Sequence, residues 1–101
     1  QHTVDMKRFP EITPAELEYR AKLVELHYSG DLSLLQKFLS EADESKTDDA
    51  HAVASVRIKR EFADTDQRSL PCIRTQALKL FHAHTKEMEE KYGEQARLFD
   101  L

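Results

Sequence analysis

Apolar side chains recur every three or four positions along most of the chain, which is the spacing of amphipathic helices. The start of one helix is clear, because Thr13 and Glu16 form a capping box with Pro14 in the first turn. Gly30 ends the same apolar pattern, and glycine there favours a left-handed helix end. The sequence therefore predicts a first helix over residues 14–29.

Three further helices are predicted downstream, at about 32–42, 49–63 and 69–92, each from an apolar stripe at helical spacing. The alternating alanines and valines inside residues 49–63 would also suit a strand. Residues suited to helix ends support each of these three helices. Asp31 is expected to cap the start of the helix at 32–42, and Thr47 or Asp48 the start of the helix at 49–63. Ser69 and Pro71 are expected to open the helix at 69–92, and Gly93 to end it.

Composition supports helices over sheets. The 101 residues include two glycines and three prolines, with 40% hydrophobic and 34% charged residues. Strained turns and phosphate-binding loops need glycine, so this composition argues against a β-sandwich, a dinucleotide-binding domain or a phosphate-loop enzyme. We expect an all-α bundle of about four helices over residues 13–92, with an irregular N-terminal arm at 1–12 and a short C-terminal tail at 93–101.

The cellular location is predicted from cysteine and charge. Cys72 is the single cysteine and cannot form an internal disulfide, which points to a reducing compartment. The longest stretch without Asp, Glu, Lys or Arg is residues 50–56, too short to cross a membrane. No charged leader with an apolar core opens the chain. We therefore expect a cytoplasmic protein without membrane contacts.

The first predicted helix is apolar on two nearly opposite sides, as expected of a helix enclosed between two partners. Either it is central within one domain, or its second stripe forms the interface of a homodimer. We predict the homodimer and leave the first alternative open. One stripe is Leu17, Ala21, Val24 and Tyr28; the second, the predicted interface, is Tyr19, Leu23 and Leu26.

Charge is divided into blocks along the chain. Residues 31–49 hold six acidic and two basic side chains, whereas residues 50–86 hold three acidic and seven basic ones. A short turn could bring the basic residues into one patch that docks an acidic protein surface. The predicted docking residues are Arg57, Lys59, Arg60, Arg68 and Arg74.

Two resemblances give a nucleic-acid alternative. Residues 56–60 and 67–70 resemble the Trp-repressor region ahead of its recognition helix, which implies a helix-turn-helix regulator, although the usual glycine turn is missing. Residues 95–99, Gln-Ala-Arg-Leu-Phe, resemble the peptide with which bacterial proteins dock on the replication sliding clamp. That resemblance implies a tail tethered through Leu98 and Phe99; the alternative is that these two residues fold back and complete the core.

Enzymatic signals are weak. Arg20 and His27 resemble the Arg-x4-6-His signature of HEPN-type ribonucleases, which are small all-helical dimers. His84 belongs to an apolar stripe and is predicted to be a hydrogen-bonded core histidine. Cys72 is predicted to be a small buried residue. No Ser-His-Asp order, paired-carboxylate motif or metal-ligand set is present.

The sequence thus predicts a non-enzymatic protein–protein interaction or regulatory module, homodimeric, with no catalytic residue, cofactor or metal. A DNA-associated regulator and a HEPN-like ribonuclease remain the alternatives.

Overall fold

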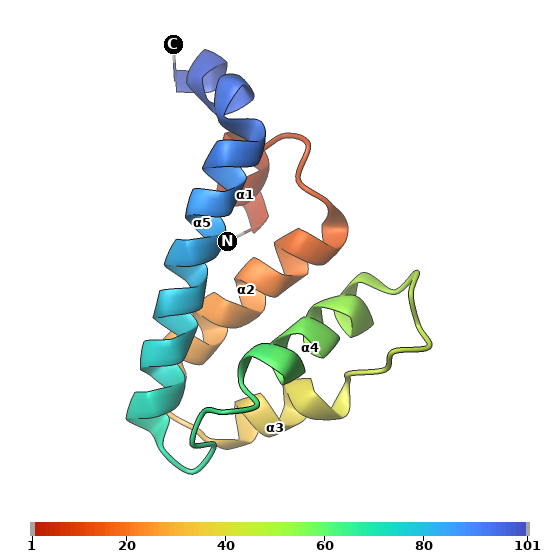
Figure 1. Ribbon diagram of the computed structural model, residues 1–101, viewed down its shortest axis with the longest axis vertical. Helices are drawn as coiled ribbons and strands as arrows, with labels where there is room; N and C mark the ends of the chain where they lie inside the picture. Colours follow the sequence, from red (N-terminus) through yellow and green to blue (C-terminus); the bar gives the residue numbers. More distant parts are fainter. Residues whose placement is uncertain (1, 101) are drawn as a thin grey trace.

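A computed structural model describes the backbone of residues 2–100 and the side chains of residues 4–92. It confirms the all-α prediction, since no strand occurs within residues 2–100. In Figure 1, α2 passes between α5 and α4, and α3 packs against α4. The helices are α1 (His2–Arg8), α2 (Pro14–Tyr28), α3 (Ser33–Ser40), α4 (Ala50–Glu61) and α5 (Leu70–Asp100).

The capping box predicted for α2 is present. The Thr13 hydroxyl accepts a hydrogen bond from the Glu16 amide at 3.2 Å, and the Glu16 carboxylate accepts one from the Thr13 amide at 3.2 Å. These bonds satisfy two amides that the first turn would otherwise leave without partners. The start of α2 is therefore encoded locally.

The other helix ends differ from the prediction. Gly30 does not adopt a left-handed conformation; α2 ends at Tyr28, and Ser29 after it is already extended. α3 begins at Ser33, and Leu32 rather than Asp31 directly precedes it; the Asp31 carboxylate still accepts from the Ser33 amide at 2.8 Å. Asp49, rather than Thr47 or Asp48, caps α4, because it directly precedes the first helical turn and accepts from two of its amides.

Both ends of the chain are more helical than expected. Residues 2–8 form α1 in place of an irregular arm, because contacts with α2 and α5 hold a segment that has no apolar stripe of its own. α5 continues past Gly93, the predicted end, to Asp100, and the break falls at Tyr92, whose backbone is not helical. The side chains of Leu98 and Phe99 lie outside the described residues.

The core lies around α2. Tyr19, Leu23 and Leu26 are fully buried by α3, α4 and α5 of the same chain. This corrects their assignment to a subunit interface and supports the alternative that α2 is the central helix. The opposite stripe is more open, and Tyr28 is 77% exposed at its end. The residues that pack against this part of α2 are Leu35, Phe38, Ala54, Ile58, Phe62, Ile73 and Ala77.

None of the described helices combines the length and the apolar character needed to cross a membrane.

Candidate functional site

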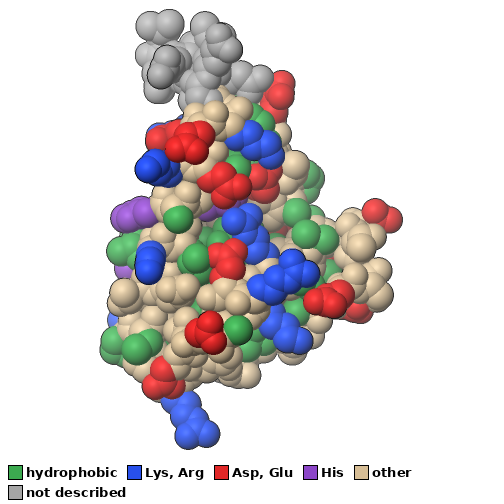
Figure 2. Space-filling view, viewed as in Figure 1, with side chains coloured by type: hydrophobic (Ala, Val, Ile, Leu, Met, Phe, Trp, Pro, Cys, Tyr) green, Lys and Arg blue, Asp and Glu red, His purple; other side chains and the backbone are tan. Residues whose placement is uncertain are grey.

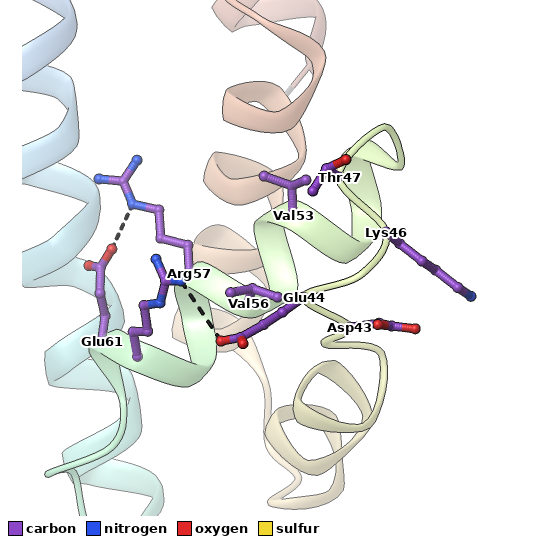
Figure 3. A pocket seen from close by; sticks show the side chains of 9 residues that line it. Asp43, Glu44, Lys46, Thr47, Val53, Val56, Arg57 and Glu61 are labelled. Atoms are coloured by element: carbon purple, nitrogen blue, oxygen red, sulfur yellow. Dashed lines mark hydrogen bonds and ion pairs between the residues drawn. The ribbon is translucent and has the colours of Figure 1, made fainter.

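A groove of about 490 Å³ lies between α4 and the loop that joins α3 to α4. Two valines of α4, Val53 and Val56, give it an apolar part, and Figure 3 shows the loop passing over them. Charged side chains surround the valines from both sides: Asp43, Glu44 and Lys46 from the loop, and Arg57, Arg60 and Glu61 from α4. The groove therefore offers a small apolar surface framed by charges of both signs.

Arg57 forms a rigid wall of this groove. Its Nε donates to a Glu61 oxygen at 2.6 Å, and its guanidinium lies 4.0 Å from the centroid of the Tyr19 ring. The Tyr19 hydroxyl donates to the other Glu61 oxygen at 2.8 Å. Burial, and next this hydrogen bond, raise the pKa of Tyr19, which keeps the phenol protonated as a donor. Glu61 thus anchors both side chains.

Arg60 is held far more loosely. Its guanidinium lies 3.8 Å from the Glu44 carboxylate, and the two side chains are 73% and 80% exposed. An exposed ion pair of this kind contributes about 0–1 kcal/mol, because water and salt screen it. Glu44 can therefore leave Arg60 at little cost.

The groove extends onto α2. A smaller hollow of about 140 Å³ shares Val53 and Arg57 with it and reaches Ala15, Glu16 and Tyr19. An extended segment lying along α4 would meet both hollows.

The five predicted docking cations do not form one patch. Arg57 and Arg60 line the groove, whereas Arg74 donates from Nε to the Ser29 carbonyl at 2.8 Å, at the end of α2. In Figure 2, basic side chains on the visible face alternate with acidic ones. The acidic loop folds against α4, and the ion pair of Glu44 with Arg60 joins the two charge blocks there. Lys59 and Arg68 are exposed outside the groove lining.

The two residues of the ribonuclease-like pattern are not brought together. Arg20 is 2% exposed and points toward α1 and α5. His27 lies at 3.2 Å, through Nδ1, from the Arg74 carbonyl. Arg20 is therefore a buried structural residue, and its side chain does not reach solvent beside His27.

A buried polar cluster surrounds Arg20, and the sequence did not reveal it. Arg20 Nε lies 2.9 Å from an Asp5 oxygen, and its two terminal nitrogens lie 3.1 Å from His84 Nδ1 and 2.9 Å from the Thr85 hydroxyl. The guanidinium also stacks 4.2 Å from the Phe81 centroid. Sequence reasoning placed His84 in the core correctly, but Asp5 lay in a segment without a helical pattern.

His84 is neutral in this cluster. Arginine can only donate, so His84 Nδ1 accepts and Nε2 carries the proton, facing Glu16 at 3.7 Å. Burial, and next the positive charges of Arg57 and Arg20, lower the pKa of His84 to about 4. The site therefore excludes the charged imidazole at neutral pH.

The remaining candidates do not add a site. No group of three or more His, Cys, Asp or Glu side chains within the described part of the chain is placed to hold a metal ion. Cys72 is exposed, which corrects the prediction that it is buried. Its place in the first turn of α5 points the side chain outward.

Comparison of the chain with protein-family models, with curated proteins and with solved structures found no match.

Proposed function

We propose that this chain is a non-enzymatic protein-interaction module whose docking surface is the groove along α4. The observation that carries the proposal is the position of Arg60, a weakly paired cation at the edge of an apolar strip. The partner segment supplies an aliphatic or aromatic side chain to Val53 and Val56 and a carboxylate to Arg60. The single, exposed Cys72 supports a reducing compartment such as the cytoplasm.

Glu44 indicates how such a segment would bind. It reaches from the loop across the groove and offers Arg60 a carboxylate from the chain itself (Figure 3). A partner carboxylate can take the same place, since the exposed pair it replaces is weak. Arg57 stays fixed by Glu61 and Tyr19, so the wall of the groove needs no reordering on binding.

Selection from a displayed library of random twelve-residue peptides tests this function. We expect the selected peptides to share an acidic residue near a large apolar one. Val56→Asp should abolish their binding, because it puts a charge into the apolar strip. Arg60→Glu should weaken it about tenfold or more, as loss of a charge-assisted contact does.

Lys59→Glu is the matched control, because it reverses the neighbouring charge on the same helix outside the groove. It should leave peptide binding within about twofold of the wild type. Peptides that bind the Val56→Asp and Arg60→Glu variants as tightly as the wild type would place docking elsewhere.

A gel shift with random duplex DNA at low salt separates this function from nucleic-acid binding. We expect no shift at about 10 µM protein, a concentration at which nonspecific DNA binders commonly associate. The reason is that carboxylates of Glu44 and Glu61 already face Arg60 and Arg57. A shift that Arg57→Glu with Arg60→Glu removes would instead favour a DNA-associated protein.

A further inference from the structure

Four side chains of α4 line the groove from the helix side, and their spacing places them on one face. They are Val53, Val56, Arg57 and Arg60, which follow one another at intervals of three, one and three residues. Arg57 is already engaged by Glu61 of the same helix. The face that a partner meets is therefore the apolar strip of the two valines, with Arg60 at its end (Figure 3).

Helix geometry sets the distances along this face. An α-helix rises about 1.5 Å per residue, so Val56 lies about 6 Å along α4 from Arg60, and Val53 about 10 Å. An extended segment advances about 3.3 Å per residue, and its alternate side chains point the same way. Two of its residues therefore span the interval from Arg60 to Val56. A carboxylate at Arg60 and an apolar side chain on Val56 belong to residues two positions apart.

The dimensions of the groove favour an extended segment over a helix. A helix that followed the face from Val53 to Arg60 would need two turns, which occupy about 800 Å³ with their side chains. The groove offers about 490 Å³. The loop also stands close to α4 on the other side, since the Glu44 carboxylate comes within 3.8 Å of the Arg60 guanidinium. An extended segment is thinner and fits between the loop and the helix.

The far end of the face sets a third requirement. Four positions from the carboxylate, an extended segment has advanced about 13 Å and has reached Val53. The small hollow toward α2 adjoins Val53, and Ala15, Glu16 and Tyr19 line it. A small apolar side chain suits these walls, whereas a carboxylate there would face the carboxylate of Glu16. The segment therefore carries its carboxylate at the Arg60 end only.

The other open hollow of the molecule does not offer this chemistry. It measures about 260 Å³ and lies between α2 and α5, where Tyr28 and Leu78 are among the side chains that line it. None of its described lining residues is a lysine or an arginine. A segment that pairs a carboxylate with an apolar side chain thus meets a matching cation only in the groove along α4.

From these distances we infer that the partner is a short extended segment with a fixed order of side chains. Read from the Arg60 end, the order is a carboxylate, any residue, a large apolar residue, any residue and a small apolar residue. The inference rests on the docking function proposed above and adds the spacing to it. Glu44 supplies only the first of these features, and Val53 remains 37% exposed. The loop of the chain itself therefore leaves the apolar strip open to a partner.

Selection from four displayed pools of twelve-residue peptides tests the spacing. Each peptide carries one Asp and one Leu, in either order, with Leu one, two, three or four positions from Asp and uncharged polar or small residues elsewhere. The full chain is the bait. We expect the two-position pool to be enriched at least tenfold over each of the others, because an extended peptide then presents both side chains on one side, about 6.6 Å apart.

Reversing the charge of Arg60 tests the register. The Arg60 side chain is 73% exposed, so Arg60→Glu keeps the fold. Against this variant the Asp pools should lose their enrichment at least tenfold, and matching pools with Lys in place of Asp should be enriched, again at two positions. Lys59→Glu is the control, because Lys59 lies outside the groove lining, and it should keep the preference for Asp at two positions.

The outcomes separate this inference from the docking function itself. Strongest enrichment at three or four positions would indicate a helical partner, and equal enrichment of all four pools would show that spacing is not selected. Either result overturns the inference while docking along α4 stands. If no pool is enriched on the wild type beyond its level on Val56→Asp, both the inference and the docking function are wrong.

Discussion

Replacing Arg20 with methionine should lower the free energy of unfolding by about 3–5 kcal/mol. Methionine keeps most of the side-chain volume beside Phe81, so the main change is electrostatic. The Asp5 carboxylate, which is almost fully buried, loses the cation 2.9 Å away. Small domains are stable by about 5–15 kcal/mol, so this single change would remove much of the total. Urea unfolding at fixed chain concentration measures it.

Two controls identify the buried charge as the cause. Asp5→Asn combined with Arg20→Met removes both charges, and we expect it to recover at least half of the loss, as uncharged replacements of buried pairs do. Arg68→Met changes an exposed arginine and should stay within about 0.5 kcal/mol of the wild type. A double variant as unstable as Arg20→Met would show that packing, not charge, dominates at this position.

Stability should also fall steeply as the pH drops from 6.5 to 4, because of His84. Above pH 6.5 the imidazole is neutral in both the folded and the unfolded chain. Below it, the unfolded chain binds a proton at the ordinary pKa of 6.5, whereas the folded chain does not until about pH 4. The difference of about 2.5 pKa units corresponds to a loss of about 3 kcal/mol across this window.

His84→Gln tests the assignment, since glutamine can accept from Arg20 but does not titrate. Thermal unfolding followed from pH 7 to pH 4.5 should show a clearly shallower pH dependence in this variant than in the wild type. His82→Gln is the matched control, because His82 is exposed two residues away on the same helix. An unchanged slope in His84→Gln would attribute the acid sensitivity to carboxylates instead.

Much of the fold follows from local signals. The capping box predicted the start of α2, and apolar stripes predicted the buried positions of α4 and α5, including Ile58 and Ile73. α1 could not be predicted in this way, because it has no stripe and depends on contacts with Arg20 and Met88 far along the chain. The two-sided pattern of α2 indicated an enclosed helix but could not say whether the same chain encloses it.

The candidate groove was only partly predictable. Arg57 and Arg60 were among the expected docking residues, because the charge blocks are visible in the sequence. The apolar strip was identified only in part: Val56 belongs to a second apolar stripe across the helix from Ile58 and Phe62, whereas Val53 lies in neither stripe. The position of Glu44 also depends on how the loop folds back over α4, and no local spacing encodes that.

Chemical-shift perturbation is the most direct measurement of the docking function. A peptide from the library selection is titrated into the isotope-labelled full chain. Amide shifts should concentrate at Val53, Val56, Arg57 and Arg60 and in the loop at 43–47. Shifts confined instead to the hollow between α2 and α5, around Tyr28 and Leu78, would contradict docking along α4.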